Sequence, residues 1–251
     1  MKKLLSLPLA LLLVVLSTAP ALAGDDVTQE SFQPFYTRAE APHLENVLPA
    51  PPTLVDPLFY YDWAQYQWGL SMRDTERGRQ AVDDAYICAA YFMQRYGEAI
   101  GIPLTPQAYP ELYRLFSRLH LTEQQAGASA KLHFQRVRPY QQYKEPSGVP
   151  EHESPTDYTS YPSGHTHASW LTGLTLVTLA PEYTEQIMKV AYELGQSRVI
   201  VGFHYQSDVD MGRIAGSITF ARVMAEPEFQ KQYEKARKEF IKNKKKKKKK
   251  P

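Results

Sequence analysis

Apolar residues recur three and four positions apart along most of this chain, whereas the strict alternation typical of strands is nearly absent. One apolar stripe lies between Asp74, a good N-cap, and Gly97, a typical helix stop, and it includes Cys88. We therefore expect one helix from 74 to 97, with Cys88 as a small core residue within it.

Two further helices are predicted between residues 112 and 138. The run Leu112–Leu119 has helical spacing, and Thr122 with Gln125 forms a capping box. This box predicts a helix that continues to about Arg138, where Pro139 ends it.

Caps and prolines also divide the second half of the chain. The stretch 140–161 is polar and contains prolines and a glycine, so we expect a long loop. Ser163 is a good N-cap for a helix that ends before Pro181. Further helices are expected over residues 184–201, 207–224 and 227–242. The pattern predicts an all-α fold, a single-domain helical bundle.

The N-terminus has the pattern of an export signal. Two lysines precede an almost unbroken aliphatic run, and Ala21–Ala23 fits a small-residue cleavage site. We expect a signal peptide over residues 1–23, followed by a Pro-rich extended arm over 24–57, the helical domain over 58–242 and a poly-Lys tail over 243–251. No other stretch is long and apolar enough for a transmembrane segment.

Charge is distributed unevenly along the chain. The sequence has 29 Lys and Arg against 27 Asp and Glu, but eight of these bases lie in residues 242–250 and two in the leader. The folded body is therefore acidic, which argues against nucleic-acid binding. The tail is expected to be a solvated, disordered terminus, and the alternative is weak contact with an anionic envelope surface.

Candidate chemistry lies in three separate clusters. Lys131 and Arg138 are seven residues apart, which on one helix places them only ~20° apart around the axis, so that both could reach one anion. In the second cluster Ser163 caps a helix, Gly164 allows a ligand to approach the backbone, and His165 stands beside the anion site formed by that helix start.

The third cluster combines Arg198 with His204 and Asp208. The spacing of four places the Asp208 carboxylate within reach of one imidazole nitrogen if the segment is helical, which would fix the tautomer of His204. Each cluster alone is commonly an ordinary helix feature. Together, three cations, two histidines and one orienting acid are the groups that phosphate-ester chemistry at a histidine requires.

These three segments resemble the phosphatase signature of the PAP2 superfamily, namely K-x6-R-P, P-S-G-H and S-R-x5-H-x3-D. The segment Thr159–Thr166 is similar to G-S-Y-P-S-G-H-T of the bacterial class A non-specific acid phosphatases, apart from Thr159 in place of glycine. The likeness covers roughly residues 45–240. It implies a bundle of the PAP2/haloperoxidase type, a periplasmic location and a homodimer or larger homo-oligomer.

The resemblance also implies a role for each residue. His204 would be the nucleophile that forms a phosphohistidine, Asp208 would orient it, and His165 would be the general acid and then the base. The substrates would be small-molecule phosphate monoesters, and neither a cofactor nor a metal would be needed. The phosphate-binding residues would be Lys131, Arg138, Ser163, Gly164 and Arg198.

Other readings of the clusters stay open. A haloperoxidase would hold vanadate in a similar cage, and a phosphotransferase would use an alcohol in place of water. A binding protein for phosphate would need the cations but not the pair of His204 and Asp208. A metallohydrolase would need a site built on His165, His167, Glu151, Glu153 and Asp157.

Overall fold

A computed structural model describes residues 32–248, and within that range it contains helices and no strand. The all-α prediction is confirmed. Short 3-10 turns cover Leu44–Asn46, Pro150–His152 and Pro181–Tyr183. The α-helices are α1 (Pro57–Met72), α2 (Glu76–Asp83), α3 (Ala89–Ala99), α4 (Pro110–Phe134), α5 (Pro139–Tyr143), α6 (Gly164–Leu179), α7 (Thr184–Ile200), α8 (Gln206–Val223) and α9 (Pro227–Lys248).

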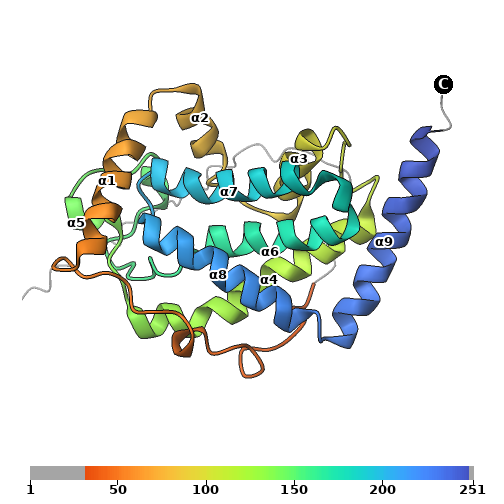
Figure 1. The fold of residues 1–251 in the computed structure, drawn as a ribbon, viewed down its shortest axis with the longest axis horizontal. Coiled ribbons are helices and arrows are strands. Elements are labelled where there is room, and N and C mark those ends of the chain that lie inside the picture. The colour runs from red at the N-terminus through yellow and green to blue at the C-terminus, as the bar shows by residue number, and fades with distance from the viewer. Residues whose placement is uncertain (1–31, 249–251) are drawn as a thin grey trace, which may run out of the picture. The chain divides into compact units, whose positions relative to one another are not determined.

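Helix α6 is the centre of the bundle, and it packs against α7, α8 and α4 (Figure 1). Its residues are apolar or small on nearly all sides, as expected of a helix enclosed by others. Glycines allow the close approach of its neighbours. A Cβ on Gly212 of α8 would lie 2.8 Å from the Ser163 carbonyl oxygen, and one on Gly173 would lie 3.0 Å from Cβ of Ala191 in α7.

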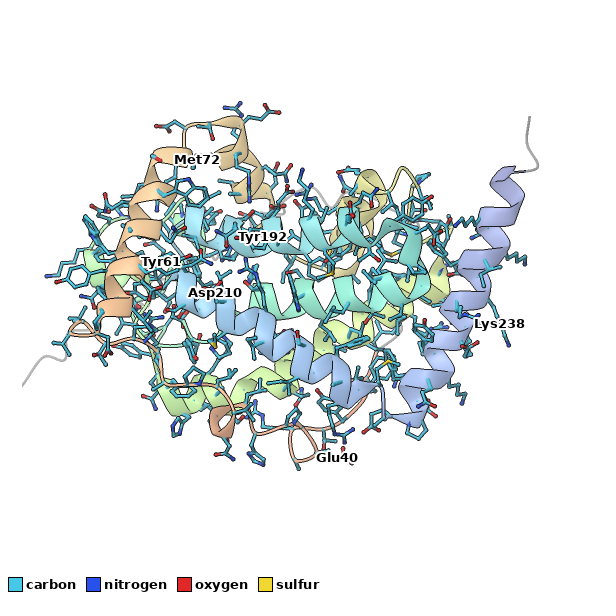
Figure 2. The ribbon with its side chains drawn as sticks, viewed as in Figure 1. Glu40, Tyr61, Met72, Tyr192, Asp210 and Lys238 are labelled. Atoms are coloured by element: carbon cyan, nitrogen blue, oxygen red, sulfur yellow. The ribbon has the colours of Figure 1, made fainter. Side chains whose placement is uncertain are left out.

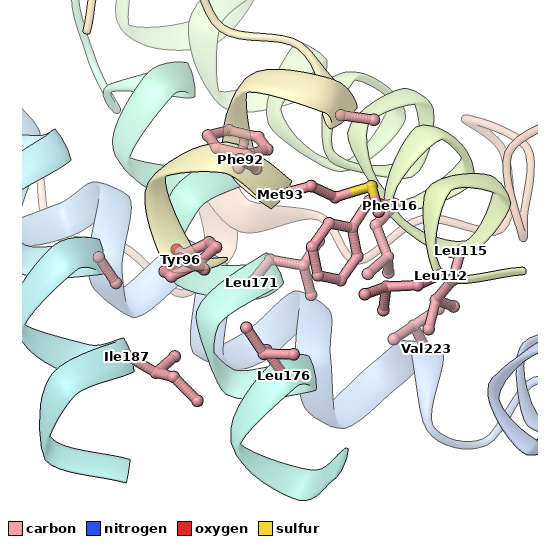
Figure 3. Close-up of a cluster of buried hydrophobic side chains, with 14 of the residues drawn as sticks. Phe92, Met93, Tyr96, Leu112, Leu115, Phe116, Leu171, Leu176, Ile187 and Val223 are labelled. Carbon is pink, nitrogen blue, oxygen red and sulfur yellow. The ribbon is translucent and has the colours of Figure 1, made fainter. Parts of the chain in front are cut away.

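The main core lies where α3, α4 and α6 meet (Figure 3). Phe92 and Tyr96 of α3 and Phe116 of α4 are fully buried there, and Leu171 of α6 packs among them. Burial of such side chains stabilises a fold by about 1.5–3 kcal/mol each. This core holds the first turn of α6 beside the last turns of α4.

The segment before α1 packs against this core. Phe35 and Leu44 are buried, and the Phe35 amide donates to the Thr122 hydroxyl at 2.9 Å. The predicted signal peptide, residues 1–23, lies outside the described residues. None of the described helices is long and apolar enough to cross a membrane.

The expected helix over 74–97 is wrong, because the structure has α2 and α3 with a break between them. The break follows Asp84, whose buried carboxylate accepts bonds from the Tyr91 hydroxyl, the Arg95 guanidinium and the Ser197 hydroxyl. These bonds fix the chain in a turn that helical spacing does not reveal. Cys88 is exposed at the N-cap of α3, so its assignment to the core is also wrong.

The capping box at Thr122 is wrong as well. The 25 residues of α4 form one helix, and the Thr122 hydroxyl donates to the Arg118 carbonyl within it. This helix ends at Gln135, which has a left-handed backbone (φ 44°), and Arg138 is the N-cap of the separate helix α5. Lys131 and Arg138 therefore do not share a helix, and the geometric reason given for their convergence fails.

Two other elements differ from expectation. Helix α9 continues to Lys248 rather than ending near 242. Helix α1 was not anticipated, because aromatic residues occur around its whole circumference and leave no apolar stripe. Tyr61 of α1 lies near Tyr192 of α7 and Asp210 of α8, where these helices meet (Figure 2).

Candidate active site

A cavity of about 550 Å³ opens between the end of α4, the start of α6 and the link from α2 to α3. Five of the eight predicted site residues line it, and these are Lys131, Arg138, Gly164, His165 and His204. The other three are fully buried beside lining residues: Ser163 precedes Gly164, the charge of Arg198 acts on His165, and Asp208 contacts His204. The structure thus brings together residues that are up to 77 positions apart in the sequence.

Lys131 projects from the last turn of α4 toward the chain that precedes α6. Its ammonium donates to the carbonyl oxygens of Thr159 and Pro162, both at 2.8 Å. Burial, assisted by the charge of Arg138, lowers the pKa of Lys131 to about 8. The two carbonyls favour the charged form, so the cation is fixed in position rather than free to swing.

Arg138 reaches the same cavity from the N-cap of α5. Its Nε donates to Asp157 at 2.5 Å, and its Nη1 donates to the Phe203 carbonyl at 3.1 Å. The same Nη1 lies 3.1 Å from Nε2 of His204. Because an arginine can only donate, Nε2 of His204 must accept, and the imidazole proton is on Nδ1. The tautomer of His204 follows from this contact.

Arg198 is the most deeply buried of the cations, with an exposed fraction of 0%. Its guanidinium lies over the Phe203 ring, 4.9 Å from the centroid. Within the described part of the chain, its Nε and Nη1 have no hydrogen-bond partner. Burial and the charge of Arg138 lower the pKa of Arg198 to about 9. Unpaired donors in a buried cation are a costly arrangement that a bound anion would relieve.

The first turn of α6 supplies backbone donors to the cavity. The Ser163 hydroxyl accepts from the amide and the hydroxyl of Thr166, as predicted for an N-cap, and keeps its own proton for a further acceptor. The amides of Gly164 and His165 precede the first intrahelical bond, which the His167 amide makes to the Ser163 carbonyl. Such a helix start attracts anions.

His165 is oriented by the link between α2 and α3. Its Nε2 lies 3.0 Å from the Ala85 carbonyl oxygen, which can only accept, so Nε2 carries a proton and Nδ1 is the titrating nitrogen. Burial, followed by the charge of Arg198, lowers the pKa of His165 well below its usual value. In the unliganded protein His165 is therefore neutral near pH 7.

Asp208 is held by more partners than the sequence suggested. His204 Nδ1 lies 3.4 Å from Oδ2 of Asp208, a longer contact than those made by Arg136 at 2.5 Å and the Ser160 hydroxyl at 2.6 Å. His204 precedes α8 rather than lying in it, so the pair spans the helix start. Burial, then the charge of Arg138, holds the pKa of His204 well below its usual value.

Sequence reasoning missed several residues of this network. Arg136 joins Asp208 to Asp62 of α1, with Nη2 2.8 Å from the Asp62 carboxylate. Asp157 fixes Arg138, and Glu123 lines the cavity beside Lys131. Spacing gives no signal for Asp62, which lies far from the clusters, and Asp157 was considered only as a metal ligand, whereas Arg136 stands inside the first cluster.

The metal site considered as an alternative is not assembled. His165 Nε2 contacts the Ala85 carbonyl, whereas His167 Nε2 contacts the Thr219 hydroxyl at 2.8 Å on α8. The two imidazoles thus bond to different elements. Among the described residues, no three His, Cys, Asp or Glu side chains converge as metal ligands would.

Comparisons with known proteins agree with this geometry. Residues 119–230 match the PAP2 superfamily. The chain is 39% identical over 248 residues to a non-specific acid phosphatase of Providencia stuartii, which covers 98% of this chain and 100% of the relative. It is 35% identical to a non-specific acid phosphatase of Salmonella typhi, with 88% of this chain and 89% of that protein covered. A third relative, an acid phosphatase of Zymomonas mobilis, is 31% identical, with 78% of this chain and 74% of the relative covered.

Proposed function

The chain belongs to the PAP2 superfamily and is an acid phosphatase, and on that premise we propose that it hydrolyses phosphate monoesters through a phosphohistidine formed on His204. The observation that carries this proposal is the tautomer of His204. Its Nε2 faces the cavity as an acceptor at 3.1 Å from Arg138, while its protonated Nδ1 is directed at Asp208. An imidazole held in this form presents a lone pair to phosphorus.

Substrate binding prepares the nucleophile in this proposal. The phosphate oxygens take the donors of Arg138, Arg198 and Lys131, together with the backbone amides at the start of α6. Arg138 then exchanges its contact with His204 for one with the anion, which frees the Nε2 lone pair. Fixed cations in a buried site stabilise the charge that develops during transfer.

The chemical step forms the bond from Nε2 of His204 to phosphorus and breaks the bond from phosphorus to the ester oxygen. The departing alkoxide takes a proton from Nδ1 of His165. The bound anion offsets the charges of Arg198 and Arg138 that lower the pKa of His165 in the empty site, so His165 gains its proton with the substrate.

Hydrolysis of the intermediate uses the same groups in reverse. Neutral His165 takes a proton from water, the oxygen of that water attacks phosphorus, and the bond to His204 breaks to release orthophosphate. We propose that no metal ion takes part, because Lys131, Arg138 and Arg198 supply the positive charge. Chelation with EDTA should therefore leave activity unchanged, and its loss would remove this part of the proposal.

Release of phosphate from a panel of monoesters tests the function, with the His204→Ala and His165→Ala variants beside the wild type. His204→Ala should lose activity toward every substrate. His165→Ala should keep more activity toward p-nitrophenyl phosphate than toward alkyl phosphates, because nitrophenolate leaves without protonation. Equal losses for both leaving groups would contradict the role of His165, and full activity of His204→Ala would contradict the mechanism.

Export to the periplasm through residues 1–23 is also proposed, and so is assembly into a homodimer or larger homo-oligomer. Osmotic release of an active protein whose N-terminus follows Ala23 would support the first. Sedimentation of that protein tests the second. Salt-dependent retention on cells, compared with a variant that ends at Lys242, tests whether the poly-Lys tail contacts an anionic surface.

A further inference from the structure

Glu123 is a buried acid in the cavity for which the mechanism above has no use. It lies on α4, two turns before Lys131, and its exposed fraction is 4%. It lines the same cavity as His165 and His204. Its Oε1 would lie only 3.2 Å from a Cβ at Gly164, the residue that opens α6. This carboxyl therefore stands at the edge of the proposed phosphate site.

The carboxyl has no ionic partner that would balance a negative charge. In the described part of the chain it forms no ion pair with a lysine or an arginine, and the Lys131 ammonium instead donates to the carbonyls of Thr159 and Pro162. Its contact is with His167, whose Nδ1 lies 3.5 Å from Oε1 and has no hydrogen-bond partner. A buried carboxyl without compensation is stable only in its protonated form.

We infer that Glu123 is a further phosphate-site residue, whose neutral carboxyl admits the phosphate group and whose ionised form excludes it. This inference rests on the proposed phosphate chemistry and adds to it. A neutral carboxyl can donate its proton to a phosphate oxygen beside the Gly164 amide. An ionised carboxylate at the same position repels the anion and competes for Lys131.

The charged and titratable groups around Glu123 support this behaviour. His120 and Lys131 share its helix, His167 faces it from α6, and Tyr36 approaches from the segment before α1. Burial raises the pKa of Glu123 to about 8, and Lys131 lowers it only in part. Burial also lowers the pKa of His167, to about 3, so His167 stays neutral and brings no compensating charge.

The test is orthophosphate binding measured by calorimetry between pH 6 and pH 9, for the wild type and for Glu123→Gln. The glutamine keeps the shape and a donor but cannot ionise. Because phosphate and Lys131 titrate in both proteins, the pH dependence of the ratio of their affinities reports the change at position 123. The two should bind within about threefold at pH 6, and at pH 9 the wild type should bind roughly tenfold more weakly than the variant.

Glu151→Gln is the matched control. Glu151 accepts a bond from the hydroxyl of Tyr86, a cavity residue, and this bond lowers the pKa of Glu151, so its carboxylate is already ionised at pH 6. Replacement of Glu151 by glutamine should change the phosphate affinity by the same factor at every pH. Only Glu123→Gln should show a factor that grows with pH.

The number of protons taken up with phosphate gives an independent test. At pH 9, phosphate binding should be accompanied by proton uptake, detected as heats that differ between buffers of different ionisation enthalpy, and Glu123→Gln should take up about one proton fewer than the wild type, because His165 and Lys131 still take up protons in the variant. A ratio of the two affinities that does not change between pH 6 and pH 9 would overturn the inference, whether the variant binds more tightly or more weakly than the wild type. Absence of phosphate binding in all proteins would instead refute the proposed function.

Discussion

Replacement of Arg136 by methionine should destabilise the protein far more than the loss of an exposed ion pair would. Arg136 is 8% exposed and donates from Nη1 to Asp208 at 2.5 Å and from Nη2 to Asp62 at 2.8 Å. Both carboxylates are completely buried. Methionine would fill the space beside the Tyr205 ring, over which the guanidinium lies at 4.0 Å, but would leave two buried acids without their cation.

Loss of one partner from a buried ion pair costs about 3–5 kcal/mol. For a domain of this size, that corresponds to a fall of roughly 10 °C in the midpoint of thermal unfolding. Arg237→Met provides the control, because the pair of Arg237 and Glu234 is about half exposed at 3.5 Å. Loss of an exposed pair costs at most about 1 kcal/mol.

Thermal unfolding at pH 7 measures both variants. The combination of Arg136→Met with Asp62→Asn should cost less than the sum of the single changes, because it removes a buried charge together with its partner. Equal midpoints for Arg136→Met and Arg237→Met would refute the reasoning, since they would mean that the buried network contributes no more than a surface pair.

Three further outcomes are expected. Gly212→Ala should lower both stability and phosphatase activity, because the added Cβ would lie 2.8 Å from the Ser163 carbonyl oxygen and from Cβ of Thr166. Gly101→Ala is the control: the added Cβ would have open space there, and the backbone φ of 65° should cost only about 1 kcal/mol of stability. Below pH 6.5 the unfolding free energy of the unliganded protein should fall, because the unfolded chain binds protons that the folded chain excludes. Each histidine whose pKa is lowered by folding contributes up to about 1.4 kcal/mol per pH unit to this fall. Folding lowers the pKa of four histidines, and the raised pKa of Glu123 offsets one of them, so urea unfolding between pH 6.5 and pH 5 should still show the decline. Saturating orthophosphate should make that decline shallower by relieving the effect of Arg138 and Arg198, and an unchanged slope would contradict the pKa assignment.

Helices whose ends carry local signals could be predicted from the sequence. Ser163 and Pro181 delimit α6 because an N-cap and a proline act within one turn. The break between α2 and α3 could not be predicted, because the partners of Asp84 include Ser197 on α7. The end of α4 depends on a left-handed Gln135, a residue type that gives no warning of it.

The candidate site, like the fold, could be predicted from the sequence only in part. The motif residues converge on one cavity, but Lys131 and Arg138 do so from different helices, so the correct grouping followed from the family pattern and not from helical geometry. Arg136 and Asp157 act through contacts made only in the folded chain. Glu123 resembles any polar helix residue until α6 packs beside it.

Direct detection of a phosphoryl group on His204 tests the central claim. The wild type should be mixed with a phosphate monoester, quenched in alkali during turnover, digested with trypsin and analysed by mass spectrometry, because phosphohistidine is labile to acid. The account predicts that the peptide Val199–Arg213 gains the mass of one phosphoryl group, on the imidazole of His204, and that His204→Ala shows no such gain. An active wild type that never carries this adduct, or carries it on another residue, would contradict the account.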